Sequence, residues 1–415
     1  MSNKKNKIFL VSAYACEPNE GSEPGLGWNW AVELSKKNRV IVITRSNNRE
    51  NIEKEYDPQR FPGLSFEYCD IPRVLSFWKK GQRGLHMYYC MWQLECYRLA
   101  KRICREEHVD YALALTFGNM WMPTFLYKLP CSFVWGPIGG GEGVPKMLWS
   151  EVSNKQKIFE HVRTINKIFP ITNPWFFKAC KKAELLIPRT RDSLKCIPEK
   201  YRNKCITMLE TGVSSEDIKY FDNLYNEKHD ESYKNDFVCC GKMIPYKMFS
   251  LAIEAFSMVI SAGDDGKRLH FIGDGPCRRA LGEQVRNLGI EDRVIFHGRK
   301  CREETLRILA ASKALLLTSA REGGSWVMFE AMLLRKPIIC FDTSGMSVVV
   351  TKETGRMIDV CEYKKAVKRF AEEIKYISGS ADLDKIGNTA YERVVNEFMW
   401  ESKIKQLLVK LDIEK

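Results

Sequence analysis

The sequence lacks any apolar run that approaches the roughly 20 residues a helix needs to cross a bilayer. Its first residues, MSNKKNKIFLVSAYACEP, place lysines before a short apolar run, but Ser12 and Tyr14 interrupt that run and Glu17 follows it. We therefore expect a first core strand there rather than a cleaved leader. Low-complexity segments are also missing, and the content of 45% apolar and 28% charged residues is typical of a soluble globular protein.

Patterns that bind metal ions are missing as well. The six histidines are scattered, the 15 cysteines contain no CxxC spacing, and no persuasive Asp-x-Asp motif occurs. The cysteine number is odd, and Cys239-Cys240 lies inside an apolar run. We expect buried or incidental thiols in a reducing cytoplasm, with no metal ion and no cofactor.

Positive charge is concentrated in the first half of the chain. Residues 1–212 contain 33 Lys and Arg against 21 Asp and Glu, whereas residues 213–415 contain 32 against 31. Such a basic half attracts anionic lipid, an anionic acceptor or nucleic acid. Charge alone leaves these three partners open.

A length of 415 residues suits two domains of ~200 residues each. In both halves, apolar strand-like runs alternate with helical patterns, which predicts two doubly wound, Rossmann-like α/β domains that face each other across a cleft. We place the domains at 1–215 and 216–397, and expect a C-terminal helix over 398–415 to return to the first domain. The polar stretch 222–236 is typical of a linker or a hairpin tip. Further strands are expected at about 65–70, 111–116, 132–135 and 184–187, with a long helix over 85–107.

Several blocks follow one another in a recognisable order: GKMIPYK, FIGDGP, DRVIFHG and REGGSWVMFEAMLLRKPII. They resemble the blocks of retaining glycosyltransferases of the GT-B fold, specifically the glycosyl transferases group 1 family (family 4) with its E-x7-E motif. In the first half, ACEPNEGSEPGLGWNWA and FVWGPIGGGEGVP resemble a bacterial polysaccharide-assembly branch of that family. The resemblance implies an enzyme that transfers a hexose-type sugar, with retention, from UDP or GDP to a growing glycan or a lipid-linked acceptor.

The donor site is predicted around Glu322 and Glu330, which flank a strand-to-helix turn. Glycines and a helix N-terminus between them offer N–H groups to a diphosphate, and carboxylates accept hydrogen bonds from vicinal hydroxyls. The resemblance implies that Glu322 holds the hydroxyls of the donor sugar and that Glu330 holds the ribose. The alternative is a pair of solvated glutamates at a helix cap. The remaining donor-binding candidates of this turn are Gly323, Gly324, Ser325 and Trp326.

Lys242 and Lys247 follow the predicted strand FVCC. We expect both to neutralise the diphosphate that leaves when the sugar is transferred. Many relatives carry arginine at the place of Lys242 and glycine at the place of Met248. The alternative is two surface lysines. Gly298 and Arg299 follow another strand, where relatives bind the nucleotide base along the main chain, and the alternative for Arg299 is a solvated residue.

In the first half, glycine-rich turns predict contacts with the acceptor or with phosphate. Gly25, Leu26 and Gly27 are expected on a loop before the first helix. The run Gly139, Gly140 and Gly141 predicts a sharp bend or close packing against a ligand, and Glu142 either orients the acceptor or is exposed on the loop. Because residues 136–145 contain no histidine, we assign no general base.

Two stretches rich in aromatic and basic residues, 77–105 and 163–182, could lie against an anionic membrane that presents a lipid-linked acceptor. The alternative for the first is a long helix that packs its aromatic side chains into the core. We expect a cytoplasmic protein, and its peripheral attachment to the inner face of the plasma membrane is a hypothesis. We expect no nucleic-acid partner. Rival functions are nucleotide-sugar epimerisation, sugar phosphorolysis, or non-catalytic binding of membrane or nucleic acid.

Overall fold

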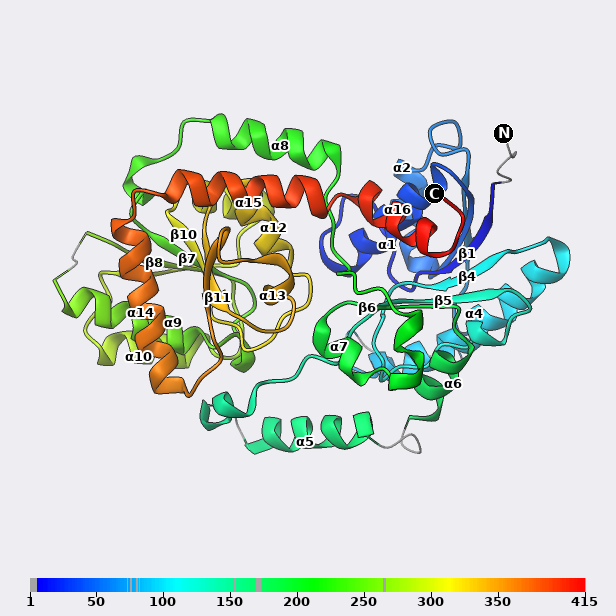
Figure 1. The fold of residues 1–415 in the computed structure, drawn as a ribbon, viewed down its shortest axis with the longest axis horizontal. Helices are drawn as coiled ribbons and strands as arrows, with labels where there is room; N and C mark the ends of the chain where they lie inside the picture. Colours follow the sequence, from blue (N-terminus) through cyan, green and yellow to red (C-terminus); the bar gives the residue numbers. More distant parts are fainter. Residues whose placement is uncertain are drawn as a thin grey trace. The chain divides into compact units, whose positions relative to one another are not determined.

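The computed structural model describes residues 6–72, 74, 77–79, 81, 83–151, 154–168, 173–263 and 266–414, without the side chains of 151, 154–156 and 166–168. Lys80 and the side chain of Lys167, both in the predicted basic-aromatic stretches, lie outside this description. The chain forms two compact units (Figure 1). The first contains Met1–Gly141, Arg163–Gly212 and Trp400–Lys415, and the second contains Glu142–Val162 and Val213–Met399.

These units differ from the predicted domains mainly in one segment. The division after Gly212 lies close to the predicted boundary at 215, and the return at Trp400 lies close to the predicted 398. Residues 142–162, which the prediction assigned to the first domain, cluster with the second unit. One physical reason is an ion pair between Glu160 and Arg321, with Nη1 and Oε1 2.7 Å apart.

The first unit is built on a parallel sheet with the strand order β3-β2-β1-β4-β5-β6. Its strands are rich in β-branched and aromatic residues and, apart from the edge strand Leu64–Tyr68, mostly buried, as expected of strands covered on both faces. They are β1 (Ile8–Ser12), β2 (Arg39–Thr44), β3 (Leu64–Tyr68), β4 (Tyr111–Ala114), β5 (Ser132–Ile138) and β6 (Leu185–Pro188).

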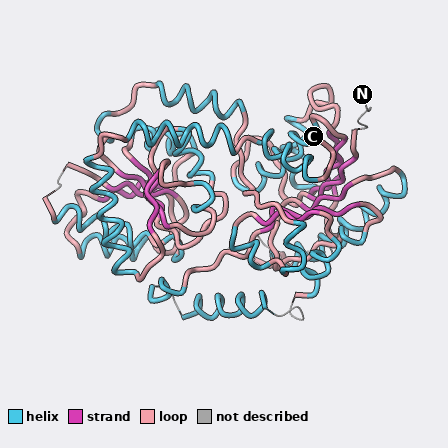
Figure 2. Tube along the Cα trace, in the orientation of Figure 1, coloured by secondary structure: helices cyan, strands magenta, loops and turns pink. Residues whose placement is uncertain are grey.

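Helices cover both faces of this sheet (Figure 2). The α-helices of the first unit, with one that straddles the division at residue 162, are α1 (Ser22–Ser35), α2 (Arg49–Glu55), α4 (Leu85–Glu106), α5 (Asn154–Ile168), α6 (Pro174–Lys182), α7 (Arg191–Cys196) and α16 (Trp400–Lys410). The C-terminal helix α16 packs against α1, so it returns to the first unit as predicted.

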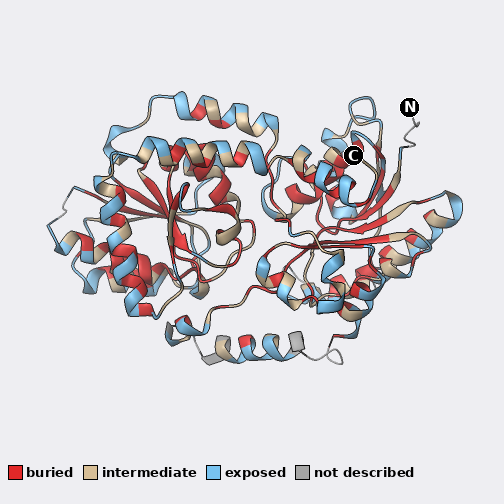
Figure 3. Ribbon diagram, viewed as in Figure 1, coloured by how far each residue is buried: buried red, intermediate tan, exposed pale blue. Residues whose placement is uncertain are grey.

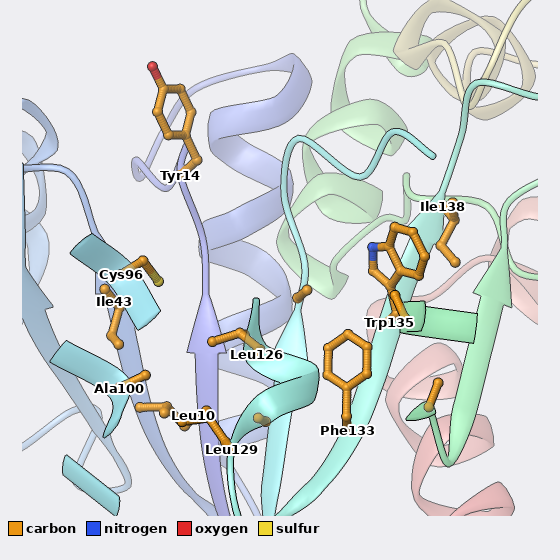
Figure 4. Close-up of a cluster of buried hydrophobic side chains, with 14 of the residues drawn as sticks. Leu10, Tyr14, Ile43, Cys96, Ala100, Leu126, Leu129, Phe133, Trp135 and Ile138 are labelled. Atoms are coloured by element: carbon orange, nitrogen blue, oxygen red, sulfur yellow. The ribbon is translucent and has the colours of Figure 1, made fainter. Parts of the chain in front are cut away.

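The core of the first unit settles one alternative. Tyr88, Tyr89 and Trp92 of α4 are buried and belong to the hydrophobic cluster of this unit. Figure 4 shows Leu10 and Trp135 of the same cluster. The aromatic residues of the predicted long helix therefore pack into the core. Phe77, which begins the aromatic and basic stretch 77–105 and precedes α4, is 78% exposed.

The second unit repeats the same architecture. Its parallel sheet has the order β12-β11-β10-β7-β8-β9, so its first and fourth strands are neighbours, as β1 and β4 are in the first sheet. The strands are β7 (Phe237–Cys240), β8 (Leu269–Ile272), β9 (Val294–Gly298), β10 (Ala314–Leu317), β11 (Ile338–Phe341) and β12 (Gly355–Ile358). The two sheets confirm the predicted pair of doubly wound α/β domains.

Two groups of helices pack on the second sheet. One group contains α9 (Phe249–Ser261), α10 (Arg278–Asn287) and α14 (Tyr363–Gly379). The other contains α8 (Ser215–Asn226), α11 (Arg302–Ala311), α12 (Trp326–Leu333), α13 (Met346–Val349) and α15 (Leu383–Glu397).

The interpretation of 222–236 as a linker is wrong for its first residues. Helix α8 extends to Asn226, and a capping box between Ser214 and Asp217 fixes its start. The prediction missed this helix because its capping pair precedes residue 222 and because only Phe221 and Leu224 of the helix are buried. Within the described residues, no helix is long and apolar enough to cross a membrane.

Candidate functional site

The carboxyl ends of β7 and β10 form the centre of the candidate site. These neighbouring strands lead to chain segments that diverge to opposite sides, which is the position where open parallel sheets bind ligands. Lys247 lies in the short helical turn η7 (Pro245–Lys247) after β7, and Glu322 lies in the loop after β10. Their side chains form an ion pair and are only 11% and 10% exposed.

Backbone contacts hold these two loops together. The Thr318 hydroxyl donates to the Lys247 carbonyl at 2.9 Å, and the Ala320 N–H donates to the Tyr246 carbonyl at 2.8 Å. The lysine and the glutamate are therefore fixed relative to each other before any ligand binds. The sequence predicted both residues at this site, and the structure brings them into direct contact.

Glu330 lies in the second turn of α12 and has a different cationic partner. The Arg302 Nε at the start of α11 donates to its Oε1 at 3.0 Å. Burial raises the pKa of the Glu330 carboxyl, and this effect outweighs the opposing influence of Arg302. The sequence did not identify Arg302, because 28 positions separate it from Glu330 and no local pattern links them.

The turn between the two glutamates approaches a neighbouring loop closely. Ser325 is the N-cap of α12, and the first turn of a helix offers N–H groups without intrahelical acceptors. The Gly345 N–H donates to the Glu322 carbonyl at 3.0 Å, and a side chain at Gly345 would lie 2.0 Å from the Gly323 oxygen. Gly323, Gly324, Ser325 and Trp326 thus lie together at the helix N-terminus, as predicted from the sequence.

Glycines end the next strands of the sheet. Gly241 and Gly273 both have a positive φ, 134° and 133°, and a side chain at Gly273 would lie 2.1 Å from the Gly241 oxygen. The Gly273 N–H donates to the Gly298 carbonyl at 2.8 Å. The ends of β7, β8 and β9 are therefore joined through main-chain atoms, and Gly298 belongs to this edge.

Met248 follows Lys247 in the left-handed region, with φ 48° and ψ 41°, and is the N-cap of α9. This is the backbone conformation that glycine adopts most easily, which explains why glycine suits the position. The methionine side chain is 3% exposed, so its packing offsets the backbone strain.

A buried hydrogen-bonded relay supports the end of β9. Asp236 accepts from His270 Nε2 at 2.9 Å, and His270 Nδ1 lies 2.9 Å from His297 Nε2. The strand pairing shifts at His297, which is the extra residue between Phe296 and Gly298. The relay therefore fixes the bulge that precedes Gly298. The sequence alone shows no such cluster, because Asp236 directly precedes β7 whereas His270 and His297 lie in β8 and β9.

Lys242 and Arg299 are placed differently from the residues above. Both side chains are exposed on the loops that follow β7 and β9. Their location at the carboxyl edge of the sheet agrees with the prediction, but no ligand contact follows from exposure alone.

The predicted loop position of Gly25, Leu26 and Gly27 is wrong. All three residues are buried in the first two turns of α1. A side chain would lie 1.9 Å from the Glu20 oxygen at Gly25 and 2.1 Å from the Ala15 oxygen at Gly27. Both glycines are thus required for packing the loop against α1, and contact with phosphate or acceptor stays a prediction.

The second glycine run packs against protein atoms. A side chain would lie 2.4 Å from the Arg189 Cζ at Gly139 and 2.4 Å from the Ser193 Cα at Gly141. The Gly140 carbonyl accepts from Trp121 Nε1 at 3.0 Å and from Arg163 Nη2 at 2.8 Å. Glu142 is 3% exposed, which contradicts the alternative of simple loop exposure. Its predicted role toward an acceptor stays a prediction.

The carboxyl edge of the first sheet contains groups that the sequence did not reveal. Glu23, on α1, accepts a hydrogen bond from the Phe117 N–H after β4, and burial raises the pKa of this carboxyl. Arg189, after β6, donates to Glu210 at 3.0 Å. Glu23, Phe117 and Arg189 lie in segments that follow β1, β4 and β6. The strand order brings these segments to one edge of the sheet, which the sequence does not show.

No group of three or more His, Cys, Asp or Glu side chains in the described part of the chain is arranged to hold a metal ion. The 15 cysteines, all in described positions, are free thiols.

Residues 222–393 match the family model described as glycosyl transferases group 1. N-acetyl-alpha-D-glucosaminyl L-malate synthase of Bacillus anthracis is 29% identical over 155 residues, 37% of this chain and 39% of that protein. Poly(ribitol-phosphate) alpha-N-acetylglucosaminyltransferase of Staphylococcus aureus (strain COL) is 23% identical over 176 residues, 40% of this chain and 33% of that protein. The chain therefore spans well under half the length of these curated relatives.

A solved structure resembles the whole chain. The crystal structure of Anabaena Alr3699/HepE in complex with UDP has a TM-score of 0.61 and covers 98% of this chain and 99% of that chain. The sequence identity is 15%, so the likeness shows the fold.

Proposed function

We propose, because residues 222–393 carry a domain of the glycosyl transferases group 1 family, that this chain is a glycosyltransferase of bacterial cell-surface polysaccharide synthesis. It would move a hexose-type sugar from a nucleotide-sugar to a growing glycan or a lipid-linked acceptor, with retention. The observation that carries the proposal is the buried pair of Lys247 and Glu322 at the switch point, with Glu330 in the helix that follows Glu322. The likeness to a protein that binds UDP supports UDP as the nucleotide, with GDP as the alternative.

The diphosphate of the donor would lie against Lys247 and the N-terminus of α12. Negative charge grows on the leaving phosphate as the bond to the anomeric carbon breaks, and a fixed ammonium and a helix N-terminus stabilise that charge. We expect Lys242 to add a second, more mobile cation. In this proposal the diphosphate takes over the Lys247 ammonium from Glu322, and the Glu322 carboxylate turns to the sugar hydroxyls.

Glu330 would accept hydrogen bonds from the two ribose hydroxyls. Arg302 holds its carboxylate in one orientation, which reduces the entropy lost when the nucleotide binds. Gly298 and Arg299 would line the base, with recognition through main-chain atoms.

Retention requires the acceptor oxygen to bond to the anomeric carbon on the face from which the phosphate leaves. The acceptor hydroxyl then lies beside the leaving phosphate oxygen, and that oxygen can take up the proton. No side-chain base is needed for this step, which fits the lack of a histidine in residues 136–145.

The acceptor is proposed from chemistry alone. A basic first half suits an anionic or lipid-linked glycan, and we propose a cytoplasmic protein that attaches peripherally to the inner face of the plasma membrane.

A thermal-shift panel of UDP-, GDP- and ADP-sugars tests the proposal, because a ligand that binds only the folded state raises its melting temperature. We expect one nucleotide class to raise it and Glu330→Ala to abolish that rise and the turnover. Normal turnover in Glu330→Ala would contradict the assignment. Conversion of donor without acceptor into an epimer would favour the epimerase instead.

A further inference from the structure

Helix α5 has an unusual distribution of polar and apolar side chains. A surface helix normally buries an apolar stripe and exposes its charged residues. In α5, Ile158, Val162 and Ile165 are 64%, 49% and 51% exposed. Their spacing of four and three residues places them on one face of the helix, and Figure 3 shows α5 as largely exposed. Phe159, beside this stripe, is 57% exposed.

The opposite face of α5 carries two charged residues that contact the protein. At 100° per residue, Glu160 and Arg163 lie about 160° and 140° away from Ile158 around the helix. Glu160 is 3% exposed and bonds to Arg321 at 2.7 Å. Arg163 Nη2 donates to the Gly140 carbonyl at 2.8 Å. Glu160 and Arg163 therefore attach α5 to the protein, while Ile158, Val162 and Ile165 are exposed.

Charge indicates what this outer face meets. The α5 sequence contains four basic residues and one acidic residue, and that acidic residue, Glu160, is bonded to Arg321. Lys157 directly precedes Ile158 in the chain and is half-buried. The first 212 residues carry a surplus of 12 positive charges. An apolar stripe with basic neighbours matches the boundary between anionic headgroups and acyl chains.

We propose that α5 is a docking helix for an anionic lipid bilayer, in which Ile158, Val162 and Ile165 enter the interface. The inference rests on the proposed function only for the use of docking, because a lipid-linked acceptor would be presented at a bilayer surface. It also links docking to the donor site. Glu160 pairs with Arg321, which directly precedes Glu322, so the docked helix would support the loop that carries this glutamate.

The test uses the full chain and vesicles of phosphatidylcholine with or without about a third phosphatidylglycerol. We expect the protein to float with the anionic vesicles, and the bound fraction to fall with added salt. The triple variant Ile158→Ser, Val162→Ser, Ile165→Ser should weaken this partition at least about tenfold, because each side chain loses apolar area that the interface buries.

A matched control is available elsewhere on the surface. Met258, Leu288 and Val409 are 42%, 40% and 41% exposed, and their triple change to serine should leave vesicle binding unchanged. Phe77→Ser tests the rival stretch over 77–105. Unchanged flotation of the α5 variant, or loss of flotation in Phe77→Ser alone, would overturn the proposal.

Two further measurements separate this proposal from others. If the wild-type chain is an oligomer by light scattering and the α5 variant is a monomer that still floats, the face binds a second copy and the proposal is wrong. The thermal shift by nucleotide-sugar should persist in the α5 variant, which also shows that the variant folds. Loss of the nucleotide shift in the wild type would overturn the proposed function but not the docking helix.

Discussion

Lys247 and Glu322, 75 positions apart in the sequence, form an ion pair that leaves each side chain about nine-tenths buried. Removal of one partner from a buried pair leaves an uncompensated charge, which is more costly than removal of both. The pair is thus a structural contact in the free protein and, in the proposed function, the group that a diphosphate would rearrange.

A double-mutant cycle at this pair separates its two roles. We expect Lys247→Met to lower the free energy of unfolding by about 3 kcal/mol, and the double variant with Glu322→Gln to recover most of that loss. Turnover should fall about 100- to 1,000-fold in both variants, because the diphosphate loses its fixed cation. Denaturant unfolding and initial rates measure the two effects. Lys242→Met, at an exposed lysine, should leave the stability unchanged, and recovery of turnover in the double variant would contradict the role of Lys247.

The raised pKa of Glu330 predicts opposite pH dependences for binding and stability. As the pH falls through this pKa, the carboxylate gains a proton and loses acceptor capacity, so the donor should bind more weakly. The folded chain takes up this proton before the unfolded chain does, so this group's contribution to the free energy of unfolding should increase over the same window above the usual 4.5.

The matched variants at this site are Glu330→Gln and Arg302→Met. Glu330→Gln should show neither pH effect. Since Arg302 lowers the pKa of Glu330, Arg302→Met should move the loss of donor affinity to a higher pH. Calorimetric binding of the nucleotide between pH 4.5 and 7.5 checks both. A profile that Arg302→Met leaves unshifted would argue against coupling between the two residues.

Met248 predicts an inverted order of two substitutions. Both Met248→Ala and Met248→Gly lose the buried side chain, which costs about 2 to 5 kcal/mol. Only glycine relieves the left-handed backbone with φ 48°. Met248→Gly should therefore be more stable than Met248→Ala by about 1 kcal/mol, although glycine usually weakens a structure relative to alanine. Urea unfolding measures the difference, and the same pair at Met258, inside α9, should give the usual order.

His297 predicts a loss of stability in mild acid. Burial lowers the pKa of His297, and the neighbouring His270 and Lys300 lower it further. The unfolded chain therefore takes up a proton near pH 6.5 while the folded chain does not, and the free energy of unfolding should fall as the pH decreases below about 6.5. It should level off below the lowered pKa. His297→Gln should remove this part of the pH dependence, and an unchanged slope between pH 7 and 5 would exclude His297 as its source.

The sequence by itself determined the alternation of strands and helices in both halves, most strand positions and the donor-side blocks. Buried parallel strands are short continuous apolar runs, and glycine-rich turns with a carboxylate at a strand end remain recognisable without any tertiary information. Glu322, Lys247 and Glu330 could be named because the blocks that contain them resemble those of the glycosyl transferases group 1 family. The apolar spacing of residues 400–410 also predicted a last helix with one buried face, whereas its contact with α1 comes from the tertiary structure.

Only the tertiary structure decided which charges meet. Strand order places the loop after β7 beside the loop after β10, and no local pattern encodes that Lys247 faces Glu322 or that Arg302 faces Glu330. The same holds for Glu160 and Arg321, whose ion pair is one contact between residues 142–162 and the rest of the second unit. Local spacing controls which residues share a face of one element, whereas contacts between distant elements arise from packing, which balances many weak terms at once.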